Sequence, residues 1–152
     1  MIEIIVVVMI VLVLAAISIP SLLHAREVAT EASATGALRT ITVGQVTYFA
    51  LYQGYAPSLA ALGPPKRGGV PSAIAADLID EQLATGEKGG YRFRYSAIDV
   101  DGDGLAEAYL VVAEPSRGGA RRAFFVDQTG AVSSVGSEPD REKPGTVGGE
   151  PK

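Results

Sequence analysis

Hydrophobic and polar positions first separate the start of the chain from the rest. Residues 4–19 are apolar apart from Ser18, and the acidic residue Glu3 stands directly before them. As a helix this run is about 24 Å long, slightly short of a full bilayer crossing. Together with residues 1–3 and the helical turns after Pro20 it is long enough to cross. We therefore predict a hydrophobic helix over residues 1–20.

The pattern continues beyond Pro20 as an amphipathic helix over residues 21–55. Proline removes one intrahelical hydrogen bond and clashes with the preceding turn, so we expect the long helix to be bent or partly unwound near Pro20. Apolar or small residues recur near helical spacing. They are Leu22, Ala25, Ala29, Ala32, Gly36, Leu38, Ile41, Gln45 and Phe49.

The middle of this helix is rich in small side chains, which permit close approach of another element. They are Ala29, Ala32, Ala34, Gly36 and Ala37. Two interpretations stay open: packing against a second helix, or packing against the domain that follows in the same chain. Both can hold on different faces.

The remainder predicts a globular head over residues 56–136 and a polar tail over 137–152. A Gly- and Pro-rich stretch at 54–71 indicates a loop with one short helical turn. Ser72 caps a predicted short helix that Gly86 ends. Strand-like runs follow at 91–98, 105–114 and 121–128, with a shorter one at 131–135 after a turn. The tail is rich in Gly and Pro, and we expect it to be flexible.

Alternation within the first strand-like run places Tyr91, Phe93 and Tyr95 on one face and Arg92 and Arg94 on the other. Short links between successive strands imply an antiparallel meander laid against the long helix. The predicted fold class is therefore α+β, with a long N-terminal helix packed against a small antiparallel sheet of three or four strands.

Composition excludes several classes of function. The net charge of −4 offers no electrostatic basis for binding nucleic acid. The chain has no cysteine, which excludes disulfides, thiolate metal sites and thiol redox chemistry. His24 is the one histidine, and no nucleophile motif, phosphate-binding loop or paired acid–base site is present. We expect no enzymatic activity, no required cofactor, and a solvated or packed His24.

The hydrophobic helix has three interpretations. A secretory signal peptide prefers a basic start, and this start is acidic, although Leu23, His24 and Ala25 loosely resemble a cleavage site. A plain membrane anchor explains the apolar run but not Glu3. A carboxylate at the edge of hydrocarbon costs a few kcal/mol unless a partner pairs with it, so the third interpretation gives Glu3 a partner.

An acidic residue heading an apolar helix, a proline seventeen positions later, an amphipathic continuation and a small sheet domain together resemble a mature type IV pilin or related pseudopilin. The resemblance is strongest over residues 1–50. QGYAPSLAALG, LIDEQLATGEKGGYRFRY and FFVDQTGAV resemble the globular part of some short bacterial pilins. Two features depart from the family: Met1 and Ile2 replace an N-methylated phenylalanine and the few residues after it, and the C-terminal cysteine pair is missing.

The resemblance implies a structural subunit that polymerises through its N-terminal helix into an extracellular filament. Glu3 would pair with the positively charged N-terminus of a neighbouring subunit, and the helix would unwind near Pro20 in the filament. The partners would be copies of the same chain, the inner membrane before assembly, and the pilus assembly machinery. A pseudopilin of a type II secretion system is the alternative within the family, and a membrane-anchored calcium-dependent binding domain is the alternative outside it.

A run of acids at residues 99–107 is the second chemical signal. Asp99, Asp101 and Asp103 occupy positions 1, 3 and 5 of a calcium loop, and Glu107 occupies position 9. Gly104 supplies the glycine of position 6, where the chain turns sharply. Three closely spaced acids repel each other unless a cation neutralises them, which favours calcium.

Two observations oppose a calcium loop of the usual kind. Position 12 is Leu110, which offers no carboxylate, and strands rather than helices flank the run. A further ligand would have to come from Glu107, Glu114 or an acid of the tail. The alternative is a tight turn between strands, for which Asp and Gly are the expected residues.

Aromatic residues gather at the end of the long helix, at Tyr48, Phe49, Tyr52 and Tyr55. We interpret them as packing between the helix and the sheet. A path of aromatic rings that conducts charge between subunits is an alternative that this sequence leaves open.

Overall fold

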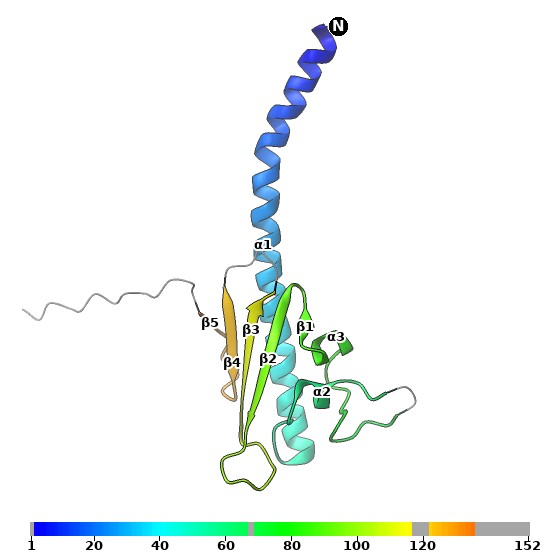
Figure 1. Cartoon of the computed structure of the whole chain (residues 1–152), viewed down its shortest axis with the longest axis vertical. Helices are drawn as coiled ribbons and strands as arrows, with labels where there is room; N and C mark the ends of the chain where they lie inside the picture. The colour runs from blue at the N-terminus through cyan, green and yellow to red at the C-terminus, as the bar shows by residue number, and fades with distance from the viewer. Residues whose placement is uncertain (1, 67–68, 117–121, 136–152) are drawn as a thin grey trace, which may run out of the picture.

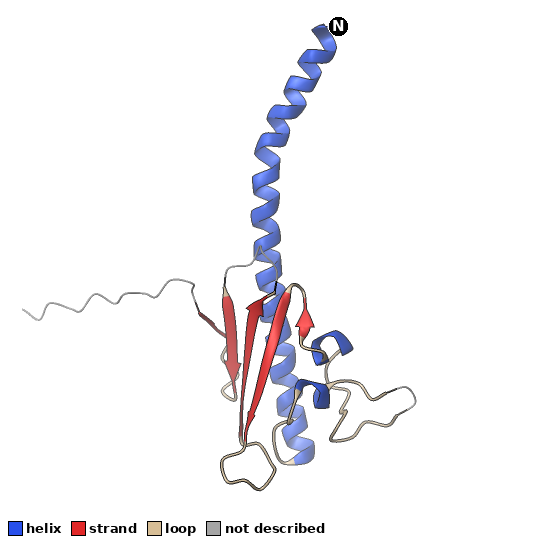
Figure 2. Cartoon of the chain, viewed as in Figure 1, coloured by secondary structure: helices blue, strands red, loops and turns tan. Residues whose placement is uncertain are grey.

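The computed structural model describes residues 2–66, 69–116 and 122–135. It shows the predicted α+β architecture, in which a long N-terminal helix packs along one face of an antiparallel sheet (Figure 1, Figure 2). The helices are α1 (Ile2–Tyr52), α2 (Leu59–Leu62) and α3 (Glu81–Ala84). The strands are β1 (Glu87–Lys88), β2 (Tyr91–Ile98), β3 (Ala108–Pro115), β4 (Ala123–Asp127) and β5 (Ser133–Val135).

Helix α1 contains 51 residues and continues through Pro20 without a break. The expectation of a bent helix is met by the gentle curve of its N-terminal half in Figure 1, whereas the alternative of local unwinding is not. Proline removes a single hydrogen bond, and the bonds on either side of it hold the helix together. The helix ends at Tyr52, because Gln53 takes a left-handed conformation (φ 63°) while its N–H bonds to the carbonyl of Phe49 at 2.9 Å.

The sheet has five strands in the order β1-β2-β3-β4-β5, all antiparallel. The prediction of three or four strands was too low because β1, with two residues, is too short to give a pattern. It forms where Gly89 and Gly90, with φ of 60° and 81°, turn the chain back onto β2. The other predicted strands exist; β2 has the predicted bounds, and β3, β4 and β5 all start later than predicted.

The predicted helix over residues 72–86 was wrong in its first half. The backbone at Ala76 and Leu78 instead donates hydrogen bonds to Ala61 and Leu62 of α2, each at 2.8 Å. These tertiary bonds hold the segment in a non-helical conformation, and within the predicted range only the four residues of α3 are helical. The predicted helical turn in the preceding loop is confirmed as α2.

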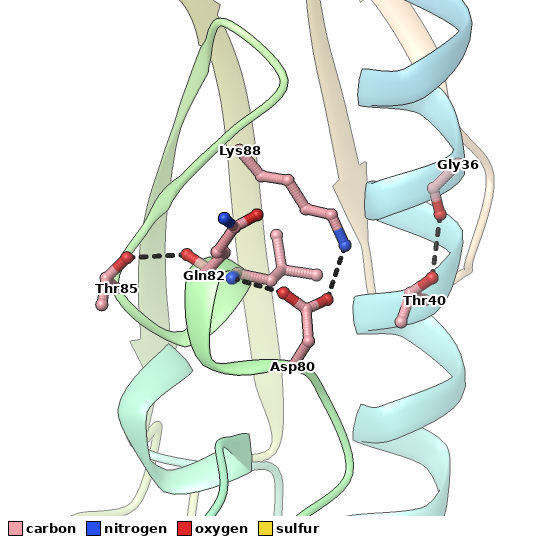
Figure 3. A network of polar contacts seen from close by, with 7 residues as sticks. Gly36, Thr40, Asp80, Gln82, Thr85 and Lys88 are labelled. Carbon is pink, nitrogen blue, oxygen red and sulfur yellow. Dashed lines mark hydrogen bonds and ion pairs between the residues drawn. The ribbon is translucent and has the colours of Figure 1, made fainter.

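Asp80, rather than Ser72, caps α3 (Figure 3). Its carboxylate accepts a hydrogen bond from the backbone N–H of Leu83 at 3.0 Å and pairs with the Lys88 ammonium at 2.6 Å. The bond to Lys88 is the main cause that lowers the pKa of Asp80 below its ordinary value. One acid therefore fixes α3 and ties it to β1.

The core of the head lies between α1 and the sheet. One face of α1 is buried there, through Ala34, Ala37, Leu38, Ile41, Gly44, Gln45 and Tyr48. The alternation predicted for β2 is confirmed, since Tyr91 and Phe93 are buried, Tyr95 is half-buried, and Arg92 and Arg94 are exposed. The described core joins this face of α1 to the inner face of the sheet and to α2 and α3.

The structure divides the predicted helical stripe between two faces. Leu38, Ile41 and Gln45 are buried as expected, whereas the positions from Leu22 to Gly36 and also Phe49 are exposed. The small residues divide in the same way: Ala34 and Ala37 pack against the head, and Ala29, Ala32 and Gly36 do not. Packing within the chain therefore explains two of the five small residues.

Candidate functional site

The N-terminal part of α1 projects beyond the head, with its end far from the sheet (Figure 1). No part of its 18-residue apolar window is buried. Among the described residues, α1 is the one helix long and apolar enough to cross a membrane, a criterion that an N-terminal signal sequence or the core helix of a soluble protein also meets. The head begins to cover α1 at Glu27 and Thr30, which are half-buried, so the projecting part is about 25 residues long, or roughly 38 Å.

Glu3 and Pro20 both lie on this projecting part. Glu3 is exposed in the first turn of α1, where the helix dipole favours a negative charge. It forms no ion pair with any residue in the described ranges. Pro20 lies about 26 Å further along the helix axis, so the two residues are well separated along α1. His24 is also exposed on this part.

The acidic residues 99–107 form the loop between β2 and β3, at the end of the head opposite the N-terminus (Figure 1). All four predicted candidates are brought together: one carboxylate oxygen from each of Asp99, Asp101, Asp103 and Glu107 lies within 4.8 Å of the others. All four side chains are exposed. Carboxylate oxygens are the ligands that hard cations such as calcium prefer, so this cluster could bind such an ion.

Hydrogen bonds within the loop aim the carboxylates. Asp99 accepts from the backbone N–H of Gly102 at 2.6 Å and of Gly104 at 3.0 Å, while Glu107 accepts from that of Val100 at 2.8 Å. Both glycines have positive φ, 78° and 90°, which residues with a Cβ rarely adopt. These bonds also satisfy the carboxylates in part without an ion, so the tight-turn interpretation accounts for the same geometry.

The structure distinguishes the proposed extra ligands. Glu107 joins the cluster, whereas Glu114 lies seven residues further along β3 and pairs with Arg94 at 3.2 Å. Leu110, at position 12 of the calcium-loop pattern, is an exposed residue of β3 and offers no carboxylate to the cluster. The tail acids lie outside the described residues.

The aromatic residues at the end of α1 connect the helix to the sheet. The ring centroids of Tyr48 and Tyr52 are 4.5 Å apart, those of Phe49 and Tyr55 are 5.0 Å apart, and Tyr55 meets Tyr109 of β3 at 4.9 Å. Tyr48 is buried, and Tyr52 and Tyr55 pack against the core. Packing between helix and sheet was the right interpretation for these three rings, while Phe49 is exposed.

Sequence analysis missed an apolar surface on the head itself. Val43 and Val46 of α1 are 66% and 62% exposed, on the face of the helix that points away from the sheet. The sequence did contain a signal for this surface: Val43 and Val46 continue the helical spacing of the exposed small residues Ala29, Ala32 and Gly36. The two sets lie on one line along the helix.

Comparison of the chain with protein-family models, with curated proteins and with solved structures gives no match in any of the three. The likeness to type IV pilins therefore stays a resemblance, carried by the order of Glu3, the apolar run and Pro20 and by a compatible fold.

Proposed function

We propose that this chain is a structural subunit that polymerises through α1 into an extracellular type IV pilus-like filament. The observation that carries the proposal is the projecting apolar helix, of which no part of the apolar window is buried in the chain. Apolar surface in water is unfavourable by roughly 25 cal/mol per Å², so this surface needs a membrane or other protein around it. A bilayer covers it before assembly, and copies of the same helix cover it afterwards.

Glu3 favours the subunit docked in the filament over the lone subunit in the membrane. A carboxylate at the edge of hydrocarbon is unfavourable while it is unpaired. In a bundle of low dielectric, an opposite charge from a neighbouring subunit recovers part of the lost solvation, but only when the two are docked. Assembly by the pilus machinery would thus relieve a subunit that is unfavourable when it stands alone in the inner membrane.

Replacing Glu3 with alanine or glutamine is expected to abolish or strongly slow filament assembly. The reason is that neither side chain carries the charge that docking neutralises. The measurement is the number of filaments per cell by electron microscopy, with the amount of subunit in the membrane determined in parallel. Substitution of the exposed Glu81 in α3 with alanine is the matched control and should leave filament counts unchanged. Normal counts from Glu3→Ala would refute this role.

Two alternative functions remain distinguishable from the first. A pseudopilin of a type II secretion system would form a short periplasmic assembly rather than a long filament. A membrane-anchored, calcium-dependent binding domain is favoured by the four convergent carboxylates of the loop at 99–107. It would stay monomeric in detergent and would need the ion for binding.

Calcium binding to this loop is tested by thermal unfolding of the head. With calcium at 100 times its dissociation constant, the folded state gains about 2.7 kcal/mol, which should raise Tm by roughly 10 °C. The paired change Asp101→Asn and Asp103→Asn should abolish the shift, because it leaves two of the four carboxylates. An unchanged Tm for the parent chain with millimolar calcium would leave the loop a plain turn.

A further inference from the structure

A line of exposed residues follows α1 along its whole length. The line is obtained by alternating steps of four and three residues from Ile4 to Ala50, and we refer to it as the seam. Every position on it is exposed except Ala15, which is half-exposed; up to Arg26 the other sides of α1 are exposed too, so exposure distinguishes the seam from residue 27 onward. The average step of 3.5 residues is the period that keeps one side of a helix in contact with another helix wound around it.

The seam lies on the opposite side of α1 from the head. We number a seven-residue repeat so that the seam positions are the first and fourth. The buried residues of α1 then occupy the third and sixth positions (Ala34, Leu38, Ile41, Gln45 and Tyr48) and the second position (Ala37 and Gly44). These positions point away from the seam. The head therefore leaves the seam open along its whole length, including the level of Val43 and Val46.

Side-chain size changes along the seam. Its N-terminal end carries the branched residues Ile4, Val8 and Val11, and its middle carries the small residues Ala25, Ala29, Ala32 and Gly36. Two copies packed without a shift would leave the small residues facing each other. A shift along the axis sets the branched side chains of one copy onto the small side chains of the other, which fills space better.

Polarity selects one shift among those that preserve the repeat. From Ile4 to Ala50 the seam has two polar members, Ser18 and Arg39, and they are 39 − 18 = 21 residues apart, or three repeats. With no shift, Arg39 would meet Arg39 of the other copy, and like charges repel. A shift of one, two, four or five repeats would set Arg39 on Ala32, Ala25, Val11 or Ile4. Only three repeats set it on Ser18.

We propose, building on the filament function above, that α1 packs in parallel against α1 of a second copy along the seam, shifted by three repeats. The shift corresponds to about 32 Å at 1.5 Å per residue. The Oγ of Ser18 donates to the carbonyl of Leu14 at 2.9 Å, which leaves its lone pairs free to accept from the Arg39 guanidinium of the second copy. Arg39 makes no ion pair with any residue that the structure describes, so it is available.

This contact joins two different stretches of the same seam, so each copy keeps one stretch free to receive the next copy. Such a head-to-tail contact does not close on itself and extends into a polymer. The small residues that packing with the head left unexplained thus receive a partner. Glu3 lies off the seam, on the side of α1 that faces the head, and its charge is met by another neighbour.

Disulfide trapping tests the shift in the full chain, which has no native cysteine. Chains carrying Val8→Cys and chains carrying Ala29→Cys are mixed, allowed to assemble, and oxidised. Facing seam residues fall within the Cα separation that a disulfide spans, about 4.4–6.8 Å. We expect a dimer band that contains one chain of each kind. The control mixes chains carrying Met9→Cys with chains carrying Thr30→Cys. These two positions have the same 21-residue offset but lie on another side of the helix, so this pair should give no dimer band.

The outcomes separate this inference from the filament proposal. A dimer band from Ala29→Cys alone as the major product would show unshifted packing and would overturn the inference. Filaments that form without the Val8–Ala29 product would also overturn it, while the filament function stands. Absence of filaments and of every disulfide product, with native tyrosine fluorescence of the head retained, would overturn both. Ser18→Asp, which places a carboxylate beside Arg39, should increase the Val8–Ala29 product, and adding Arg39→Leu should remove the increase.

Discussion

Replacing Gln45 with alanine is expected to lower the free energy of unfolding of the head by about 3–4 kcal/mol, a large part of the 5–15 kcal/mol typical of a domain. Gln45 is fully buried in the face of α1 that meets the sheet. Its Oε1 accepts from the backbone N–H of Ala56 at 2.9 Å, and its Nε2 donates to the Tyr95 hydroxyl at 2.8 Å. That hydroxyl in turn donates to the carbonyl of Ala56.

Each partner in this ring of three hydrogen bonds comes from a different element: α1, the segment after it, and β2. Burial is the main cause that raises the pKa of Tyr95 above its ordinary value, which keeps the phenol neutral and able to donate. Truncation at Gln45 leaves the buried N–H of Ala56 without its acceptor, at about 1–3 kcal/mol, and opens a cavity as well.

Two further variants separate these contributions. Gln45→Met keeps the volume and loses the hydrogen bonds. It should therefore show only the loss caused by the unpaired N–H of Ala56, without the loss caused by the cavity. Gln82→Ala, at an exposed position of α3, should change stability by no more than about 0.5 kcal/mol. Denaturant unfolding followed by tyrosine fluorescence suits the measurement, because all six tyrosines lie between residues 48 and 109 and there is no tryptophan. A loss below about 1 kcal/mol for Gln45→Ala would contradict the role of the ring.

Leu38→Ala is expected to destabilise the head by about 2–5 kcal/mol, the usual range for a buried leucine. Leu38 has no exposed surface and lies in the core between α1 and the sheet. Alanine has a higher helix propensity than leucine, so the loss measures packing and not helix formation. The same fluorescence measurement applies.

The matched control for Leu38 is Val43→Ala on the opposite face of the same helix. Because Val43 is 66% exposed, its truncation should change head stability by at most about 0.5 kcal/mol. Equal losses at the two positions would mean that the head covers both faces of α1, contrary to the structure. The contrast also tests whether the seam is free in the isolated subunit.

Sequence patterns correctly predicted the elements that are long enough to show a regular spacing of apolar residues. The alternation of β2 and the helical spacing of α1 were both recoverable, because period 2 and period 3.6 are fixed by backbone geometry. The helix expected at 72–86 failed because its apolar residues, including Ile74 at 82% exposure, follow a helical spacing that tertiary hydrogen bonds to α2 override. The strand β1 was missed because two residues carry no period.

The candidate sites divide in a similar way. The spacing of Asp99, Asp101, Asp103 and Glu107 predicted that their carboxylates converge, since a short loop keeps near neighbours in sequence close in space. That Glu114 takes no part was settled only by the ion pair it makes with Arg94 on the adjacent strand. Pairing across strands depends on register, which a single strand's sequence does not specify.

The sequence by itself determined the long helix, the strand β2, the apolar run behind Glu3 and the acidic loop, because each depends on residues that are neighbours along the chain. Only the tertiary structure decided which face of α1 packs on the sheet and which stays open. That choice depends on contacts between residues far apart in sequence, such as those of Gln45 with Ala56 and Tyr95. A helix pattern shows that a face is apolar, but the element that covers it is set by the fold.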